Sequence, residues 1–507
     1  MTAADPSGVL VVGAGPAGLM LAAELTLAGV AVTVVDRLPS RSPYCRGFTL
    51  GPRSLDLLDR RGVVDRFLAE GPAVPYAMFA DPGRPLDLTA LDSGHPHLLG
   101  IAQTRVEELL EEWLAGLGVT VARGREVTGF TQDGDGVEVT IRTDGGTGRP
   151  RYGYLAGCDG SRSLVREVAG IGFPGTAATS YGLLADVSLA DPGALPFGVT
   201  QGEHGSVFVI PRPGYVRIVL EEPEPPADRD EPVRPEYFQR VLDTVLGRRV
   251  GLTAPRWLSR FSDAARLADR YVSGRVVLAG DAAHIHPPAG AVGVDVALAD
   301  AVNLGWKLAA TVLGHAPDGL LESYHRERHR AGARVLRTTR AQTLLAGTDP
   351  ALDPVRELFG ELARDPGAAR CLAGVVTGTD TRYGPDAPGR HPWLGALAPD
   401  LEVVTEGGPT RLAALLAPAR PVLLVRETRA LPAGTESRVD VHRVRCPGHP
   451  DHPGFEGFDG FDGLLIRPDG HTVWVSTAAD PEPDHTLLAA LTTWFGIRDG
   501  SPEHAGG

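Results

Sequence analysis

Cysteine, lysine and long apolar segments are all scarce in this 507-residue chain. The short first apolar run follows Asp5 rather than a basic segment, unlike a signal peptide, and no run is long enough to cross a bilayer. Scattered cysteines without a CxxC pair argue against disulfides and a thiolate metal site. They are Cys45, Cys158, Cys371 and Cys446. We therefore expect a cytoplasmic protein with no membrane partner.

Positive charge is also in short supply. The formal net charge is −14, and Lys307 is the only lysine among 49 basic residues. A negative surface repels phosphate backbones and anionic lipids, so nucleic acid is not an expected partner. The hydrophobic and charged fractions, 43% and 22%, are ordinary for a globular protein. The length suggests about three domains.

Glycine, in contrast, is concentrated near the start of the chain. Residues 9–36 have the pattern strand, glycine turn, helix, strand, with a carboxylate, Asp36, at the end of the second strand. Such a turn admits a pyrophosphate at the helix N-terminus, and the carboxylate can accept hydrogen bonds from ribose hydroxyls. We predict a dinucleotide site, with a purely structural glycine turn as the alternative. Its residues are Gly13, Gly15, Pro16, Ala17, Gly18, Asp36 and Arg37.

Two further corners of this kind follow much later in the chain. Asp159-Gly160 and Gly280-Asp281 each come where an apolar strand ends and a turn begins. Ligands of open α/β sheets bind at such strand ends. One corner is commonplace, but three together favour a single extended nucleotide cofactor.

The rest of the chain divides by composition. Helical periodicity is present in residues 53–68, 104–117, 295–313 and 321–345. Residues 180–270 contain strand-like pieces that predict a separate, mostly antiparallel sheet. Residues 385–398 are rich in proline and glycine and indicate a linker, and the tail alternates strands with helices.

The helix predicted at residues 321–345 is rich in arginine. Such a helix could attract a phosphorylated cofactor, although a solvated face that pairs with carboxylates is the simpler interpretation. The arginines are Arg326, Arg328, Arg330, Arg334, Arg337 and Arg340.

Several of these segments together resemble one family. The sequence is similar to the FAD-dependent aromatic hydroxylases of p-hydroxybenzoate-hydroxylase type, and most closely to the polyketide hydroxylases of antibiotic pathways. The matching pieces include VVGAGPAGLMLAAEL, SPYCRGFTL, GIAQTRVEELLEEW, GCDGSRSLVREVAGIGFPG, RVVLAGDAAHIHPPAG and DAVNLGWKLA.

The resemblance implies an α/β (α+β) fold with a discontinuous FAD-binding, Rossmann-like domain. That domain would span residues 1–179 and 271–384, interrupted by a substrate-binding β-sheet domain at 180–270. After the linker, residues 399–507 would form a thioredoxin-like domain, redox-inert because it lacks a CxxC pair.

The resemblance also assigns roles to residues. The glycine turn and Asp36 would hold the ADP half of FAD, and Asp281 the ribityl chain. Asp159 would contact FAD and NADPH. No catalytic base is implied. Other cofactor contacts would be Arg46, Gln103, Gly293, Val294 and Asp295, and the flavin-adjacent residues His286, Pro287 and Pro288.

Metal binding is not expected near that loop. His284 and His286 are two residues apart, without the cysteine or carboxylate companions of a metal site. Arg46 outside its motif would be an ordinary surface arginine.

One segment departs from the family pattern. After Pro288 the family usually has Gly-Gly-Gln-Gly, a Leu or Met, and then Asn-Thr-Gly, whereas this chain has residues 290–297 as GAVGVDVA. Asp295 thus replaces an asparagine. The replacement is either a simple exchange of helix N-caps or a charge that disfavours reduced, anionic flavin.

The implied activity is aromatic hydroxylation of a polycyclic polyketide. NADPH, bound transiently, would reduce FAD, and O₂ would add to give a C4a-hydroperoxide that transfers oxygen to the ring. Baeyer–Villiger oxidation on the same scaffold is one alternative. A non-redox dehydratase, or a binding subunit, with an altered flavin loop is the other. The enzyme would act as a monomer or homodimer.

Overall fold

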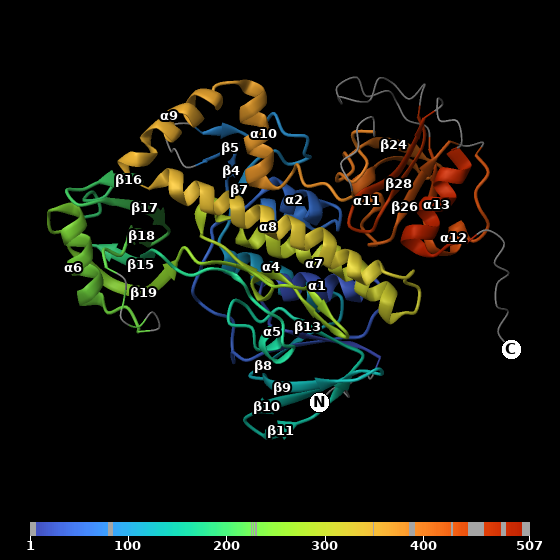
Figure 1. The fold of residues 1–507 in the computed structure, drawn as a ribbon, viewed down its shortest axis with the longest axis horizontal. Coiled ribbons are helices and arrows are strands. Elements are labelled where there is room, and N and C mark those ends of the chain that lie inside the picture. Colours follow the sequence, from blue (N-terminus) through green and yellow to red (C-terminus); the bar gives the residue numbers. More distant parts are fainter. Residues whose placement is uncertain are drawn as a thin grey trace. The chain divides into compact units, whose positions relative to one another are not determined.

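The computed structural model describes residues 7–79, 85–224, 226, 228, 231–347, 349–384, 391–426, 429–444, 461–477 and 483–498 (Figure 1). Two compact units are distinguished by their internal contacts. Unit 1 lies within residues 1–173, 267–284 and 289–507, and unit 2 within residues 174–266 and 285–288. The first and the last described segments of the chain therefore contribute to the same unit.

A six-stranded sheet forms the centre of unit 1. Its order is β21-β22-β13-β1-β2-β8, and neighbours pair in parallel except β21 with β22. Residues 9–11 are fully buried, as is usual for parallel strands, and the strands predicted at 9–12 and 31–35 are confirmed to within one residue. The strands are β1 (Val9–Val12), β2 (Val32–Asp36), β8 (Val121–Arg123), β13 (Tyr154–Gly157), β21 (Val272–Ser273) and β22 (Val276–Leu278).

Two helices pack closely beside this sheet, α1 (Pro16–Leu27) and α7 (Gly293–Val312). A Cβ on Gly305 of α7 would overlap the Glu24 side chain of α1, so glycine permits their close approach. Glu24 is buried, and Arg61 donates hydrogen bonds of 2.6 and 2.8 Å to its two oxygens. The long helix α8 (Leu320–Ala346) packs against α7 (Figure 1). None of the described helices is long and apolar enough to cross a membrane.

The helix predicted at residues 53–68 is wrong in one respect. The chain turns at Gly62, where φ is +68°, and forms two helices, α2 and α3. The remaining α-helices of unit 1 before the C-terminal segment are α2 (Pro52–Asp59), α3 (Val64–Leu68), α4 (Gln103–Gly116), α5 (Leu164–Val168), α9 (Asp353–Leu362) and α10 (Pro366–Thr377). The short strands here are β3 (Thr49–Leu50), β4 (Ala73–Val74), β5 (Tyr76–Ala77), β6 (Leu86–Asp87), β7 (Leu98–Gly100) and β23 (His284–Ile285).

A small antiparallel sheet extends unit 1 after β8. Strand β10 pairs with β9, β11 and β12, and its Val137, Val139 and Ile141 point into the core. The strands are β9 (Glu126–Gln132), β10 (Val137–Thr143), β11 (Gly146–Gly148) and β12 (Arg151–Tyr152).

Unit 2 is built on a five-stranded antiparallel sheet in the order β16-β17-β18-β15-β19. Helix α6 (Pro235–Leu246) buries Phe238 and Leu242 against the apolar residues of these strands. The antiparallel sheet agrees with the alternating pattern of the sequence. Its strands are β15 (Tyr181–Leu189), β16 (Gly198–Gln201), β17 (Ser206–Arg212), β18 (Tyr215–Glu221) and β19 (Leu252–Ser262). Two short strands outside this sheet, β14 (Gly175–Thr176) and β20 (Ala265–Leu267), pair with each other.

The C-terminal segment has its own mixed sheet, β27-β26-β28-β29, in which β26 pairs in parallel only with β27. This arrangement suits the predicted thioredoxin-like domain. Residues 385–390 of the predicted linker lie outside the described residues, and so does Cys446 of the tail. In the rest of the linker, Trp393 and Ala398 are buried. The elements are β24 (Glu402–Thr405), β25 (Gly408–Arg411), α11 (Leu412–Leu415), β26 (Val422–Val425), α12 (Thr435–Arg438), β27 (Asp440–Arg443), β28 (Phe461–Ile466), β29 (Thr472–Thr477) and α13 (Pro483–Phe495).

A buried charge network fastens this segment to α7 and α8. Glu327 of α8 accepts from Lys307 and from Arg467, each at 2.7 Å. Arg467 also pairs with Asp469. Burial lowers the pKa of Lys307 to about 7 despite the attraction of Glu327. Because removal of one partner would leave a buried charge uncompensated, the network requires all its members.

Candidate functional site

The glycine turn lies between β1 and α1. A Cβ on Gly18 would overlap the Gly13 carbonyl oxygen, and one on Gly13 would overlap that of Cys158, so side chains cannot be accommodated there. Gly15, by contrast, has nothing within 4 Å of its Cβ position. Pro16 begins α1, and no side chain of the described residues caps that helix. The free N–H groups and the open space fit a pyrophosphate.

Asp36 ends β2 beside that turn. Its Oδ2 accepts a hydrogen bond of 2.9 Å from the Ala14 N–H, and its Oδ1 accepts one of 2.8 Å from the Leu38 N–H. Arg37 next to it is exposed. The two backbone bonds fix the carboxylate at the turn and leave lone pairs on both oxygens for ribose hydroxyls.

Arg46 and Gln103 come to the same region from different segments. The Gln103 N–H donates to the Gly47 carbonyl at 2.8 Å, and Gln103 Nε2 donates to Glu107 at 2.8 Å. Burial raises the pKa of Glu107; Arg46 opposes this shift and Asp36 adds to it. The three predicted contacts, Arg46, Gln103 and Asp36, therefore lie within electrostatic range of one glutamate.

Asp159 accepts hydrogen bonds from residues at the start of the next helix. It accepts from Ser163 Oγ at 2.5 Å and from the Val165 N–H at 3.1 Å, at the start of α5. Its contact with a cofactor stays a prediction. Burial raises the pKa of the neighbouring Cys158, so that this side chain remains a thiol at neutral pH.

The Gly280-Asp281 corner lies against α1. A Cβ on Gly280, where φ is +63°, would be 3.0 Å from the Ala17 Cβ. Asp281 itself is exposed in the short helix η1 (Gly280–Ala282). A Cβ on Gly13 would likewise be 3.1 Å from the Asp159 Cα. All three predicted corners, far apart in sequence, are thus adjacent in unit 1.

A buried carboxylate that sequence reasoning missed holds this corner. Asp300 of α7 accepts from the Gly280 N–H at 3.0 Å, from Arg328 Nε at 2.6 Å, and lies 2.7 Å from His284 Nε2. Burial alone would raise the pKa of Asp300, but the charges and hydrogen bonds of Arg328 and His284 together outweigh burial and lower the pKa. The only sign of Asp300 in the sequence was that it begins the piece DAVNLGWKLA, which resembles the family.

Asp295 lies in the first turn of α7, but Val292 is the N-cap residue, so the N-cap interpretation of Asp295 was wrong. Its Oδ1 instead accepts from the Gly51 N–H at 2.8 Å and from Ser54 Oγ at 2.5 Å, at the start of α2. Burial raises the pKa of Asp295 to about 6, against the lowering effect of these hydrogen bonds. No side-chain cap from the described residues covers the N–H groups of Gly293 and Val294.

The flavin-adjacent candidates belong to unit 2. His286 is half-buried, with Nδ1 2.8 Å from the Pro287 carbonyl oxygen; Pro287 is buried and Pro288 exposed. Their place beside the flavin stays a prediction. Within the described part of the chain, no cluster of three His, Cys, Asp or Glu side chains could hold a metal ion.

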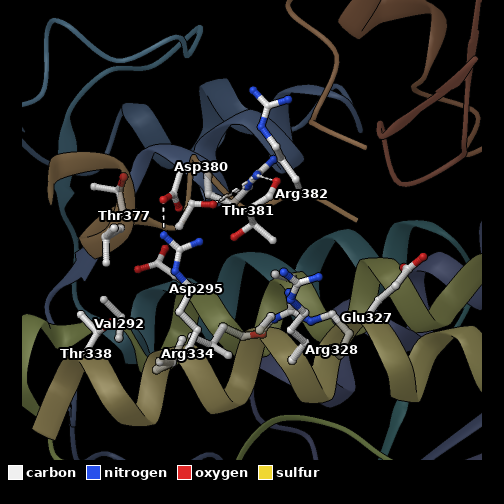
Figure 2. Close-up of a pocket in the computed structure, with 18 of the residues that line it drawn as sticks. Val292, Asp295, Glu327, Arg328, Arg334, Thr338, Thr377, Asp380, Thr381 and Arg382 are labelled. Carbon is white, nitrogen blue, oxygen red and sulfur yellow. Dashed lines mark hydrogen bonds and ion pairs between the residues drawn. The ribbon is translucent and has the colours of Figure 1, made fainter. Parts of the chain in front are cut away.

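A cavity of about 540 Å³ lies between α7, α8 and the loop after α10 (Figure 2). Every residue that lines it belongs to unit 1. Asp295 and Val292 form part of its wall, and Arg334 of α8 pairs with Asp380 of the loop. Sequence reasoning did not find this cavity, because its walls come from five separated segments, within residues 53–57, 292–303, 327–342, 375–383 and 469–471.

The parallel sheet, the glycine turn and the adjoining acidic corner define a dinucleotide-binding protein of α/β class. Residues 7–339 match the family described as FAD binding domain, and residues 391–497 match the aromatic-ring hydroxylase C-terminal family. The chain belongs to the FAD-dependent aromatic-ring hydroxylases. It is an FAD-dependent monooxygenase.

Similar proteins cover almost the whole chain. The 12-dehydrotetracycline 5-monooxygenase/anhydrotetracycline 6-monooxygenase of Streptomyces rimosus is 41% identical over 96% of this chain and 98% of its own. The solved anhydrotetracycline hydroxylase of Streptomyces rimosus superposes with a TM-score of 0.88 at 39% identity, over 97% of this chain and 99% of that one. The dialkyldecalin synthase of Streptomyces rugosporus is 38% identical over 96% of this chain and 98% of its own.

Proposed function

We propose that this monooxygenase consumes NADPH and O₂ to hydroxylate an aromatic ring of a polycyclic polyketide in antibiotic biosynthesis. The observation that carries the proposal is the likeness to a tetracycline-pathway monooxygenase across 96% of the chain. The FAD-dependent class supplies the oxygen chemistry, and the substrate class comes from that relative.

The residues of unit 1 have distinct proposed tasks. The α1 N-terminus, with Gly13, Gly15 and Gly18 and flanking Pro16 and Ala17, holds the pyrophosphate because its N–H groups are uncapped among the described residues. Asp36, with Arg37 and Arg46 near it, holds the adenosine ribose. FAD, when bound, supplies oxygen activation and oxygen transfer.

The other half of the cofactor is assigned in the same way. Asp281 accepts hydrogen bonds from the ribityl chain, and Gln103 and Asp159 make further contacts. Gly293 and Val294 present uncapped N–H groups to the flavin ring. His286, Pro287 and Pro288 lie beside its reactive edge.

The proposal has three further parts. NADPH is a transient co-substrate, the enzyme acts as a monomer or homodimer, and its location is cytoplasmic. Cys158 and Cys371 form no disulfide within the described part of the chain, as is usual for proteins of a reducing compartment.

A second candidate is a non-redox role, as a dehydratase or a binding subunit. It is favoured by the likeness to a relative named as a synthase. Baeyer–Villiger oxidation is the third. The three differ in what the protein consumes and in the product that it forms.

The test is a visible spectrum of the purified protein, followed by NADPH and O₂ consumption with a series of polycyclic phenols and product mass under ¹⁸O₂. We expect a yellow protein, substrate-stimulated NADPH consumption, and one ¹⁸O atom in a product that resists hydrolysis. A hydrolysable lactone would indicate Baeyer–Villiger oxidation. Conversion without NADPH consumption would indicate the non-redox role.

The cofactor assignment is tested by Asp281→Ala, with the exposed Asp144→Ala as matched control. Loss of hydrogen bonds to a charged group is worth about 1.5–3 kcal/mol, or about tenfold or more in Kd for FAD. We expect Asp281→Ala to raise the Kd for FAD by this factor and Asp144→Ala to leave it unchanged. Titration of the apoprotein with FAD, followed by flavin fluorescence, measures both values.

A further inference from the structure

The turn between β28 and β29, residues 467–471, lies against an aromatic side chain of the loop after α10. Tyr383 is buried, and its ring stacks on the His471 ring with centroids 4.2 Å apart. The guanidinium of Arg467 lies 5.1 Å from the centroid of the Tyr383 ring. Two side chains of this C-terminal turn therefore hold one tyrosine ring in place.

The hydroxyl of Tyr383 connects the turn to α8. It accepts a hydrogen bond of 3.1 Å from Arg328 Nη1, and Arg328 Nε donates to Asp300 at 2.6 Å. Burial raises the pKa of Tyr383, so its hydroxyl stays neutral. Tyr383 is thus a direct link between the C-terminal turn and the arginine that pairs with Asp300.

The C-terminal turn also contacts α8 and α7 directly, one residue before Arg328 and three residues after Asp300. Glu327 of α8 accepts from Arg467 at 2.7 and 2.9 Å (Figure 2). Asn303 of α7 donates to Glu327 at 2.7 Å and to Asp469 at 3.3 Å. Residues three apart lie on the same face of a helix. The turn therefore holds both helices beside Asp300.

Asp300 in turn holds the Gly280-Asp281 corner from two sides. It accepts from the Gly280 N–H at 3.0 Å, and its carboxylate lies 2.7 Å from His284 Nε2. Asp281 lies between these two anchored residues, in the short helix η1. The direction of its carboxylate therefore depends on where Asp300 lies.

We propose that the C-terminal segment is a clamp on the flavin site, with Tyr383 as its positioning residue. Tyr383 holds Arg328, and Arg328 holds Asp300. Through Asp300 the clamp sets the Asp281 carboxylate. The proposal rests on the proposed function for the contact between Asp281 and the ribityl chain. It gives a task to a segment that has no CxxC pair.

The test is Tyr383→Phe, which keeps the ring stacked on His471 and removes only the hydroxyl. We expect the Kd for FAD to rise about fivefold or more, the size of an ordinary coupling between distant sites. The visible circular dichroism of the bound flavin should also change, because its ribityl chain is held differently. Titration of the apoprotein with FAD and spectra of the FAD-loaded protein measure the two effects.

Two control variants separate positioning from stability. Tyr237→Phe removes a tyrosine hydroxyl that bonds Glu222 at 2.7 Å in unit 2, so it repeats the chemical change elsewhere. Val422→Ala opens a cavity in a core cluster formed within the C-terminal segment, and it should lower the thermal unfolding midpoint. Both variants should keep the wild-type Kd for FAD and the wild-type flavin spectrum.

A double variant tests whether the clamp acts through the corner. Coupled residues have non-additive effects. When Asp281→Ala has already removed the carboxylate, Tyr383→Phe should therefore change the Kd for FAD less than twofold.

Two results would overturn the proposal. One is a Kd and a flavin spectrum of Tyr383→Phe that match the wild type. The other is an equal weakening by Tyr383→Phe with and without the Asp281 carboxylate. Failure of the cofactor assignment itself is recognised separately, by a wild-type Kd of Asp281→Ala alone.

Discussion

Arg328 and Arg53 line the same cavity and are both buried, at 3% and 5% exposure, yet their surroundings differ. Arg328 bonds the Asp300 carboxylate, the Tyr383 hydroxyl and the Val296 carbonyl. Arg53 bonds only carbonyl oxygens of the described residues.

The difference lies in the kind of partner. The charge of Arg328 is paired with the Asp300 carboxylate, and Asp300 in turn holds the Gly280 corner. Arg53 instead joins α2 to the loop after α10 through neutral carbonyl oxygens. Substitutions at the two positions should therefore lower the free energy of unfolding by different amounts.

The largest effect is expected for Arg328→Met. It strands the buried Asp300 carboxylate, and loss of one partner of a buried ion pair costs about 3–5 kcal/mol. Urea unfolding should show that loss, and the protein should retain less FAD because the Gly280 corner loosens. A loss below about 1 kcal/mol would contradict the scaffold role.

Asp295 is a carboxylate whose pKa is raised by burial, and no cation is paired with it among the described residues. Its pKa of about 6 in the folded protein, against 3.8 for an ordinary aspartate, means that the folded state prefers the protonated form. Stability should therefore fall as the pH rises from about 4 to above 6, by on the order of 3 kcal/mol at ~1.4 kcal/mol per pKa unit.

Asp295→Asn should remove that contribution. Urea unfolding at pH 5 and pH 7.5 should show a smaller pH difference for the variant than for wild type. Since the ionised carboxylate would also repel anionic reduced flavin, the variant should raise the flavin reduction potential or tighten FAD binding above pH 6. If potential and FAD affinity are both unchanged, the carboxylate does not act on the flavin.

Arg53→Met should cost much less than Arg328→Met, about 1 kcal/mol in the absence of ligand. The lost bonds to Gly378, Thr379 and Thr381 are partly offset because the cost of burying the guanidinium charge is removed with them. Thermal unfolding of both variants in parallel measures the contrast. Equal losses would mean that Arg53 is also a scaffold residue.

The smallest effect is expected for Arg142→Gln. Arg142 pairs with Glu126, and both side chains are exposed, at 62% and 42%. Exposed ion pairs contribute about 0–1 kcal/mol and weaken in salt. The unfolding midpoint should shift little, and raising the ionic strength should remove what difference remains.

Local pattern explains why some parts were predictable from the sequence. The strand at residues 9–12 and the turn that follows depend on neighbours in sequence, and helices α7 and α8 show their 3.6-residue periodicity. Gly62, in contrast, was not recognised as a break, because isolated glycines are tolerated within helices.

The partners of charged side chains were not predictable in this way. Sequence allowed Asp295 to be an N-cap of its own helix, whereas it accepts from Gly51 and Ser54 of α2. The arginine-rich helix favoured a solvated face, yet Arg328 on it is buried. Both outcomes depend on which elements pack together.

By itself, the sequence determined the fold class and the dinucleotide turn, because steric limits at Gly13 and Gly18 and apolar periodicity act over short stretches of chain. Only the tertiary structure decided which charges are compensated. Arg53 and the carbonyls that surround it are more than 300 residues apart in sequence. The bonding of a buried cation to carbonyls so distant in the chain is a property of packing, which no local pattern records.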